Sequence, residues 1–356
     1  MVFGPSLLER LYAYRGQKVG IVTDAFMAKS GVLDRVQNYL TDCDVLVFDE
    51  AIPEPPVDTV SKIARLLADF CPDAVIALGG GSPIDSAKAI LAIVRETMPG
   101  RRIPSIAIPT TSGTGSEVTS FAVISDPAKG RKFPLISEDL VSDVALLDPE
   151  FVRTAPPKVT ADTGMGVITH VVEAVVSTEA SHFTDAFAEK SLALAFENLP
   201  KAYDDGNNLA ARDAMHQASC LAGLAFSAAG LGVNHVLAHA LDARLHLVHG
   251  RINAVLMPYV IDWNAKIPEA AEGYARIAQR VGLDTPSTRA GIRAIEAFNT
   301  HFAIPSTLRG LGVDMEEFGR IRSEIVATAL ADACTASNPR KPSQPELESL
   351  LTRVGG

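Results

Sequence analysis

Three consecutive glycines followed by a serine form the most distinctive stretch of the chain: Gly79, Gly80, Gly81 and Ser82. An apolar run at 74–78 precedes them and predicts a buried strand, while apolar residues at helical spacing over 84–94 predict a helix. Backbone without side chains, free N–H groups and the positive end of a helix dipole favour an anion such as a pyrophosphate at this turn. The stretch matches neither Gly-x-Gly-x-x-Gly nor a P-loop, so a plain tight turn explains it equally well. Ser82 is expected to cap the helix.

A second polar loop shifts this balance toward ligand binding. It spans 109–117 and directly follows a predicted strand at 105–108. Its threonines are Thr110, Thr111 and Thr114. Because ligands of open parallel sheets bind at the carboxyl ends of the strands, where both loops fall, the pair predicts a nucleotide cofactor. Asp24, at the end of a predicted strand over 18–23, would accept hydrogen bonds from a ribose and repel a 2′-phosphate, which favours NAD over NADP.

Four histidines in the second half of the chain have types and spacing suited to a metal: His170, His235, His239 and His249. His235 and His239 are four residues apart and share one helical face, so spacing alone pairs them as ligands. Neutral imidazole is the usual nitrogen ligand of iron, zinc and related divalent ions. Spacing leaves a metal site and ordinary helical histidines equally open. The remaining isolated histidines are expected to be structural: His182, His216 and His301.

The elements that must position these residues change character along the chain. In the first half, short apolar runs alternate with amphipathic segments, which predicts a parallel sheet with helices on its faces. Predicted strands lie at 18–23, 45–48, 74–78 and 105–108, with shorter runs at 121–125 and 144–147 completing the layer, and predicted helices lie at 31–41, 57–70 and 84–94. Helical spacing then dominates at 160–179, 183–199, 208–229, 250–262, 270–282, 287–302 and 344–352. We therefore expect an α/β dinucleotide-binding domain over 1–155 and an all-helical metal and substrate domain over 156–356.

Composition limits the classes of function. The 356 residues are 47% hydrophobic and 21% charged, as in an ordinary globular protein. A net charge of −10 argues against a nucleic-acid partner or an anionic membrane surface. Four scattered cysteines without a CxxC pair suggest neither a disulfide framework nor a zinc ribbon, and fit a reducing cytoplasm. No signal segment and no 18-residue apolar run is found. We expect a cytoplasmic protein that binds neither nucleic acid nor membrane.

Longer motifs occur in order along nearly the whole chain. They are Gly79-Gly-Gly-Ser-Pro-Ile-Asp-Ser-Ala-Lys-Ala-Ile90, Pro109-Thr-Thr-Ser-Gly-Thr-Gly-Ser-Glu-Val-Thr119, Leu147-Asp-Pro149, Thr163-Gly-Met165 with Thr169-His170, Gly223-Leu-Ala-Phe-Ser227, Gly230-Leu-Gly232 and Asn338-Pro-Arg340. Together they resemble the motifs of the iron-dependent (group III) alcohol dehydrogenases. Within that family the sequence looks most like the short-chain enzymes of propanediol or ethanolamine breakdown.

This resemblance implies an NAD(P)-binding α/β domain, an all-helical metal domain and a cleft between them, an architecture shared with dehydroquinate synthases. It implies that residues 79–82 hold the pyrophosphate of NAD and that Asp85 lies by the nicotinamide. The residues implied to contact the nucleotide or lie close by are Thr110, Thr111, Thr114 and Lys132. A homodimer and association with a bacterial microcompartment are also implied. From the sequence, we expect this chain to lack the strand that the family usually has before Phe3, which is often shared across the dimer.

For the helical half, the resemblance implies three metal ligands for Fe²⁺ or Zn²⁺: His170, His235 and His249. It implies that His239 lies beside the metal and moves a proton, in place of the ligand role that spacing gives it. Phe226 would form an apolar wall for a short primary alcohol or aldehyde. The alcohol oxygen would be polarised by the metal, and its carbon would pass a hydride to the nicotinamide.

The chain departs from the family pattern at Gly166, where a fourth ligand, an aspartate, is usual. Three interpretations stay open. Water fills the position and leaves a three-histidine site, as in some catalytic zinc centres. Another carboxylate replaces it; Asp242 is a candidate, whereas Asp162 is about 12 Å from His170 along the helix axis. Alternatively, the protein is an NAD-binding pseudoenzyme without a metal.

A different reaction class is an NAD-using sugar-phosphate cyclase resembling the dehydroquinate synthases. That chemistry needs a cluster of Lys and Arg for a phosphate substrate. Residues 226–249 offer Arg244 and little else. The sequence therefore favours the alcohol dehydrogenase over the cyclase.

Overall fold

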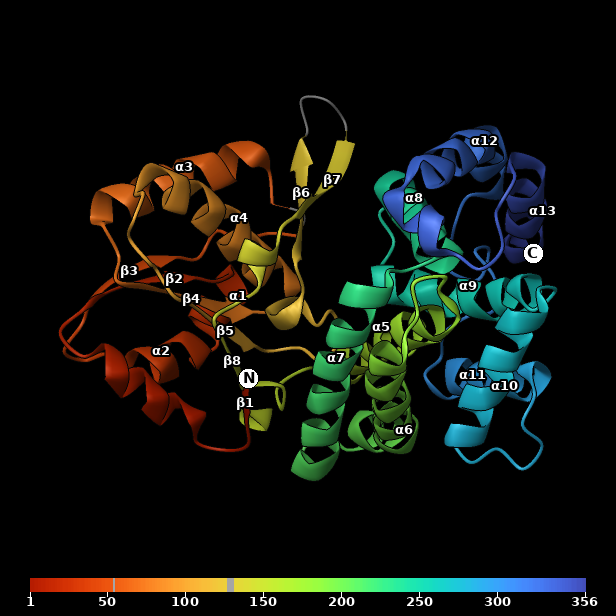
Figure 1. Ribbon diagram of the computed structural model, residues 1–356, viewed down its shortest axis with the longest axis horizontal. Helices are drawn as coiled ribbons and strands as arrows, with labels where there is room; N and C mark the ends of the chain where they lie inside the picture. The colour runs from red at the N-terminus through yellow and green to blue at the C-terminus, as the bar shows by residue number, and fades with distance from the viewer. Residues whose placement is uncertain (54, 127–130) are drawn as a thin grey trace. The chain divides into compact units, whose positions relative to one another are not determined.

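The structure, a computed structural model, describes residues 1–53, 55–126 and 131–356, without the side chains of 131–133. It forms two compact units, Met1–Ala155 and Pro156–Gly356, which are described in turn (Figure 1). The first unit is α/β and the second is helical, so the predicted fold class is confirmed.

The first unit is built on a parallel sheet of six strands. Their order is β1 (Val2–Phe3), β8 (Val144–Leu147), β5 (Ser105–Pro109), β4 (Ala74–Gly79), β2 (Lys18–Val22) and β3 (Asp44–Phe48). The central strand β4 is buried along its whole length, as its apolar run predicts. Sequence analysis did not predict β1, because two residues are too short for a periodic signal.

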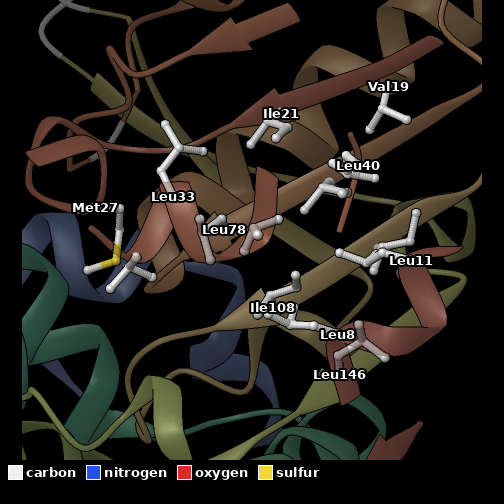
Figure 2. Close-up of a cluster of buried hydrophobic side chains, with 14 of the residues drawn as sticks. Leu8, Leu11, Val19, Ile21, Met27, Leu33, Leu40, Leu78, Ile108 and Leu146 are labelled. Carbon is white, nitrogen blue, oxygen red and sulfur yellow. The ribbon is translucent and has the colours of Figure 1, made fainter. Parts of the chain in front are cut away.

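Helices cover both faces of this sheet. On one face, Leu78 and Ile108 pack against the 3₁₀ helix η1 (Leu7–Tyr14), α1 (Ala25–Lys29) and α2 (Val32–Gln37), as Figure 2 shows. On the other face, the alternate strand residues pack against α3 (Val57–Phe70) and α4 (Gly81–Thr97). The strict alternation of strand side chains between the two cores fixes the register, and with it the edge at which the strand ends meet.

One predicted strand has a different partner from the one expected. The run at 121–125 forms β6 (Phe121–Asp126), which pairs antiparallel with β7 (Arg131–Ile136) in a separate hairpin. The prediction that it completes the parallel layer is therefore wrong. Along β6, Ala122 and Ile124 are buried whereas Val123 is 39% exposed. Such alternation is typical of a strand with one solvated face, unlike the buried strands of the main sheet.

The second unit is helical among the residues that the structure describes. Its α-helices are α5 (Pro157–Val176), α6 (His182–Asp204), α7 (Leu209–Ala229), α8 (Val233–Leu245), α9 (His249–Asn264), α10 (Pro268–Arg280), α11 (Thr288–His301), α12 (Met315–Ala331) and α13 (Gln344–Gly355), and the 3₁₀ helix η6 spans Ala333–Ser337. The seven predicted helices are confirmed with small changes at their ends. α8 and α12 were not predicted as separate helices.

Helix α5 forms the centre of this unit. It packs against α6, α7 and α9, and almost every residue after its first turn is buried. By length and composition α5 could cross a membrane, as could α7 and α8 taken as one broken span, but α7 and α8 meet at a bend of 103°. In α5, 89% of the apolar window is buried inside the structure, as in the core helix of a globular unit.

A buried histidine in α7 gives this unit a pH-dependent stability. His216 is 1% exposed, and burial lowers its pKa to about 4. Because the unfolded chain takes up this proton near pH 6.5 and the folded chain only near pH 4, stability is present above pH 6.5 and is lost as the pH falls. We expect about 2 kcal/mol of this contribution to disappear between about pH 7.5 and 5.

The measurement is the difference in unfolding free energy between wild type and His216→Gln, by chemical denaturation at each pH. Subtracting the variant removes the contribution of all other titrating groups. The stability of wild type relative to the variant should be lowest at low pH. An equal difference at both pH values would contradict the assignment of this proton to His216.

Candidate cofactor and metal sites

The glycine turn joins β4 to α4, as predicted. Gly79 has φ +147°, a conformation that side chains disfavour. The expected cap is wrong: Gly80 occupies the N-cap, and Ser82 lies inside the first turn, where its carbonyl accepts a hydrogen bond from Ser86 Oγ at 2.8 Å. No side chain of the described residues caps α4. Its first N–H groups therefore remain available to an anion.

The two polar loops meet, as the parallel sheet requires. A Cβ added at Gly80 would lie 3.2 Å from Thr111 Oγ1, and one at Gly81 would lie 2.7 Å from Thr114 Cγ2. The threonine side chains thus stand directly over the glycines, and larger residues would displace them. This close approach explains why glycine is needed at positions 80 and 81. A plain turn would not require it.

Two further predicted residues flank Gly79. The N–H of Thr110 donates to the Gly79 carbonyl at 2.9 Å. Asp24 Oδ2 lies 3.3 Å from the position of a Cβ at Gly79, which places this carboxylate at the same edge of the sheet. Asp24 Oδ1 accepts hydrogen bonds from the N–H groups of Phe26 and Met27 and caps α1. One oxygen is therefore structural, while the other faces the glycine turn.

Asp85 holds the second loop in place. Its Oδ1 accepts a short hydrogen bond from Ser116 Oγ, and its Oδ2 accepts from the N–H of Val123 at 3.0 Å. Burial raises the pKa of this carboxyl group. The other predicted residue, Lys132, lies in β7, and its side chain is outside the part of the chain that the structure describes.

A buried lysine completes this region. Lys88 Nζ donates to the carbonyls of Thr119 and Phe121, both at 2.8 Å. Burial lowers the pKa of Lys88 to about 8 and raises that of the buried Glu117 to about 7. Lys88 lies one turn of α4 beyond Asp85. Through these two side chains, α4 forms hydrogen bonds with the segment 116–123, which includes the end of the threonine loop.

In the helical unit, the four histidines and Phe226 form one group of neighbouring rings. His170 lies between Phe226 and His235, with ring centroids 4.3 and 4.7 Å away. His249 lies 5.5 Å from His235 and 5.4 Å from His239. The structure therefore brings together the three predicted ligands, the predicted proton carrier and the predicted apolar wall from α5, α7, α8 and α9.

His235 has the environment of a metal ligand. It is 1% exposed, and burial keeps its pKa well below the ordinary value, so the ring is neutral. Its Nδ1 lies 2.5 Å from Glu173 Oε2, whereas its Nε2 has no hydrogen-bond partner among the described residues. A carboxylate on one nitrogen that leaves the other unpaired is the usual arrangement around ligating histidines. Sequence analysis missed Glu173, which lies within α5 without a motif of its own.

His249 is positioned by the contact of α9 with α5. A Cβ at Gly250 would lie 2.0 Å from the carbonyl oxygen of Asp162, so only glycine permits this approach. Arg251 Nε pairs with Asp162 Oδ1 at 2.8 Å, which removes Asp162 from the candidate ligands. Asn253 Nδ2 lies 3.0 Å from His249 Nε2, so ligation through that nitrogen requires this contact to break.

His239 has a different partner from His235, although the two share a helical face. Its Nδ1 lies 2.9 Å from Asp332 Oδ2, and its side chain is 40% exposed. Asp332 Oδ1 accepts from the N–H of Cys334 and caps η6, which fixes the carboxylate. Sequence analysis missed Asp332 because α12, which delivers it, was not predicted; its place shortly before the Asn338 motif was the available signal.

Gly166 leaves open space on the same face of α5 as His170. It is buried, yet a Cβ there would meet nothing within 4 Å outside the helix backbone. By contrast, a Cβ at Gly164 would lie 2.2 Å from Leu199 Cδ1. The glycine at 166 is therefore not required by packing. The alternative ligand Asp242 lies in α8, where its carbonyl accepts the N–H of His246.

The imidazole donors are of the type that a divalent metal prefers, but the described side chains are not arranged around an ion. Three imidazoles converge, and the unpaired, buried Nε2 of His235 needs a partner. However, among the described residues no group of three His, Cys, Asp or Glu side chains is arranged to hold an ion. His170 stacks on His235, and His249 stacks on His239, so binding of an ion by all three ligands requires rotation of side chains. The alternative function, a sugar-phosphate cyclase, is not supported by Arg244, because this side chain pairs with Glu324 at an exposed position.

Comparison with known proteins identifies the family. A model of "Iron-containing alcohol dehydrogenase" matches residues 1–149, and one of "Fe-containing alcohol dehydrogenase family, C-terminal" matches residues 160–355. The 1-propanol dehydrogenase PduQ of Citrobacter freundii is 43% identical, with 98% of this chain and 99% of the relative covered. The NADPH-dependent butanol dehydrogenase of Clostridium saccharobutylicum is 38% identical, with 99% and 95% covered.

Solved structures agree with these sequence matches. The iron-containing alcohol dehydrogenase of Thermococcus thioreducens has a TM-score of 0.92 at 29% identity, with 99% of this chain and 97% of that chain covered. A 1,3-propanediol oxidoreductase has a TM-score of 0.89 at 32% identity, with the same shares covered. The chain belongs to the iron-containing alcohol dehydrogenase family. It is an oxidoreductase that interconverts an alcohol and an aldehyde, and the resemblance seen in its motifs is confirmed.

Two glycine substitutions should have opposite effects on stability. In Gly250→Ala, the added methyl meets a backbone oxygen at 2.0 Å, so the first turn of α9 must move. We expect a loss of about 1–3 kcal/mol. In the matched control Gly166→Ala, the methyl enters open space in a helix, and we expect a gain of up to about 1 kcal/mol. Thermal unfolding of both variants checks this; equal shifts would contradict the packing described for α9.

Proposed function

We propose that the protein is an NAD-dependent and metal-dependent dehydrogenase of short primary alcohols, with His170, His235 and His249 as ligands. The observation that carries this proposal is the buried His235, held by Glu173 at Nδ1 and unpaired at Nε2 among the described residues. When bound, Fe²⁺ or Zn²⁺ supplies a Lewis acid that polarises the alcohol oxygen.

The neighbouring side chains supply the remaining roles at this end of the reaction. His239 exchanges the proton with solvent, since its side chain is 40% exposed and Asp332 fixes its Nδ1. Phe226, 5% exposed and stacked on His170, offers an apolar wall that suits a short alkyl group. The named substrates of the relatives, propanol and butanol, support this class of substrate.

For the cofactor, the glycine turn and the threonines over it hold the pyrophosphate at the uncapped N-terminus of α4. Asp24 presents Oδ2 to this edge and selects NAD by repelling a 2′-phosphate. By the family resemblance, the proposal also assigns Asp85 to the nicotinamide end of the cofactor and Lys132 to the nucleotide. A sulfoacetaldehyde reductase of the same fold, 26% identical to this chain, is described in complex with NAD⁺, which supports the cofactor.

The second candidate is a metal-free, NAD-binding pseudoenzyme, and Gly166 favours it. At this position the chain offers no ligand atom, and the contact of Asn253 with His249 occupies one nitrogen of the third ligand. For the protein's setting, we propose, from the family resemblance of its motifs, a cytoplasmic homodimer associated with a bacterial microcompartment.

The deciding experiment measures metal per chain after anaerobic purification, together with oxidation of 1-propanol by NAD. Wild type should hold near one iron or zinc and turn over. His235→Asn should lose both, at least about tenfold, because the ligand is replaced by a weaker one. The control His246→Asn changes an exposed histidine with φ +50°, a conformation that Asn tolerates. A wild type that stays metal-free and inactive after incubation with Fe²⁺ or Zn²⁺ would support the pseudoenzyme.

Cofactor choice has its own test in Asp24→Asn. Asparagine retains the oxygen that caps α1 but removes the charge. We expect the ratio of kcat/KM for NAD over NADP to fall about tenfold, which corresponds to about 1.4 kcal/mol of repulsion removed. The melting temperature should stay unchanged and serves as the control. Unaltered selectivity would show that Asp24 acts only as a cap.

A further inference from the structure

We propose that Lys88 is a positioning residue for the cofactor: by fixing the segment 116–123 it holds Thr114 over the glycine turn, so that binding of the pyrophosphate depends on it. This inference rests on the proposed function, because it assumes that the pyrophosphate of NAD lies at residues 79–82. Lys88 does not touch the ligand and acts through the backbone that it holds.

The buried ammonium group of Lys88 has three hydrogen bonds within the protein. Its Nζ donates to the carbonyl of Thr119 at 2.8 Å, to Oγ1 of the same residue at 3.0 Å and to the carbonyl of Phe121 at 2.8 Å. An ammonium group has three protons, so binding a phosphate directly would require one of these bonds to break. Lys88 is 4% exposed, and a lysine is rarely buried in this way unless its charge is paired. Its charge therefore serves the segment that supplies the acceptors.

That segment has weak hydrogen bonds of its own. Between the threonine loop and β6 it forms the 3₁₀ helix η2 (Ser116–Val118). Hydrogen bonds in such a short 3₁₀ helix have poorer geometry than those of an α-helix. The N–H of Thr119 lies 3.4 Å from the carbonyl oxygen of Ser116. Because hydrogen bonds from a charged donor are stronger, Lys88 contributes more to the position of η2 than the bonds within it do.

One face of α4 contacts this region at three successive levels. Gly81, Asp85 and Lys88 are spaced by four and three residues and therefore share a face of the helix. At the first level, a Cβ at Gly81 would lie 2.7 Å from Thr114 Cγ2. At the second, Asp85 accepts a hydrogen bond from Ser116 Oγ. At the third, Lys88 holds the residues that follow η2. The helix that begins at the glycine turn thus also positions the loop above it.

Hydrogen bonds form a path from Lys88 to Thr114. The N–H of Ser116 donates to Thr114 Oγ1 at 3.3 Å, which connects the threonine side chain to the start of η2. At the other end of η2, Lys88 holds Thr119. A displacement of η2 would therefore move Thr114 away from Gly81. The first turn of α4, whose N–H groups have no side-chain cap among the described residues, would lose this neighbour of the anion site.

Acidic side chains beside Lys88 limit its direct attraction for an anion. Burial lowers the pKa of Lys88 to about 8, and the charges of Asp85 and Glu117 act in the opposite direction. Glu117 is itself 3% exposed. A cation with two acidic groups close by attracts a distant anion less than an isolated cation does. Positioning of the loop therefore explains the buried lysine better than long-range attraction of the cofactor.

The test measures the dissociation constant of ADP-ribose by isothermal titration calorimetry, because this probe carries the pyrophosphate and needs neither metal nor alcohol. Lys88→Met fills similar space without the charge and should weaken binding about tenfold. The KM for NAD should rise by a similar factor, with kcat at saturating NAD within about twofold of wild type. The control Lys18→Met makes the same change at an exposed residue at the start of β2, on the opposite edge of the sheet, and should bind like wild type.

A double-mutant cycle shows whether Lys88 acts through Thr114. Thr114→Val removes Oγ1 and nearly retains the shape of the side chain. In this background, Lys88→Met should weaken binding of ADP-ribose by less than about threefold, because the path is already broken. Equal losses of about tenfold in both backgrounds would overturn the inference, since they would indicate direct attraction by the charge of Lys88.

Thr119→Val provides a milder variant if Lys88→Met does not fold, which the melting temperature shows. It removes one of the three acceptors of Lys88 and leaves both backbone carbonyls. We expect it to weaken ADP-ribose about threefold. Unchanged binding in folded Lys88→Met, or in Thr119→Val, would overturn the inference while leaving the cofactor site intact. A wild type that binds neither ADP-ribose nor NAD would instead refute the proposed cofactor site.

Discussion

The helical unit depends on one buried carboxylate, that of Glu173. From α5 it accepts hydrogen bonds from the N–H groups of Asn234 and His235 at the start of α8, and from the ring of His235. Burial raises its pKa to about 7, against the stabilising effect of these donors. The same group thus satisfies helix N–H groups that would otherwise be orphaned and orients an imidazole. Gly232 makes the approach possible, since a Cβ there would lie 2.9 Å from Glu173 Oε1.

A second set of contacts attaches α9 to α5. Gly250 allows backbone to approach backbone, and the pair of Arg251 with Asp162 closes the contact. Asn234 Nδ2 then donates to the carbonyl and to Oδ1 of Asn253, which joins α8 to α9. His170, His235 and His249 therefore come from three helices that are cross-linked by buried polar contacts. Small displacements of any one helix would separate the rings.

Local signals account for what the sequence could predict. The glycine turn was found because strand, turn and helix follow one another within a few residues, and the threonine loop because parallel strands share an edge. The predicted cap at Ser82 failed because the extended Gly80 begins the helix earlier. Helix α12 was missed although its buried apolar residues, Phe318, Ile325, Val326 and Ala329, follow helical spacing.

Residues that act through distant partners gave no such signal. Glu173 and Asp332 are ordinary acidic residues in the sequence, and their roles follow from contacts across 62 and 93 positions. For the same reason, spacing paired His235 with His239, since both lie on one face of α8. The resemblance to the family separated the two, and the structure supplies a physical reason for doing so.

That reason lies in the solvent exposure of the two rings. Both histidines place Nδ1 against an acidic group, which favours the Nδ1–H tautomer of each ring. What differs is access to water: His235 is 1% exposed and His239 is 40% exposed. An imidazole without solvent contact cannot exchange protons quickly but can hold an ion in a dry site, whereas a solvated one can pass a proton outward. Burial, rather than position on the helix, therefore supports the proposed roles of His235 as a ligand and His239 as a proton carrier, two residues that the sequence makes look alike.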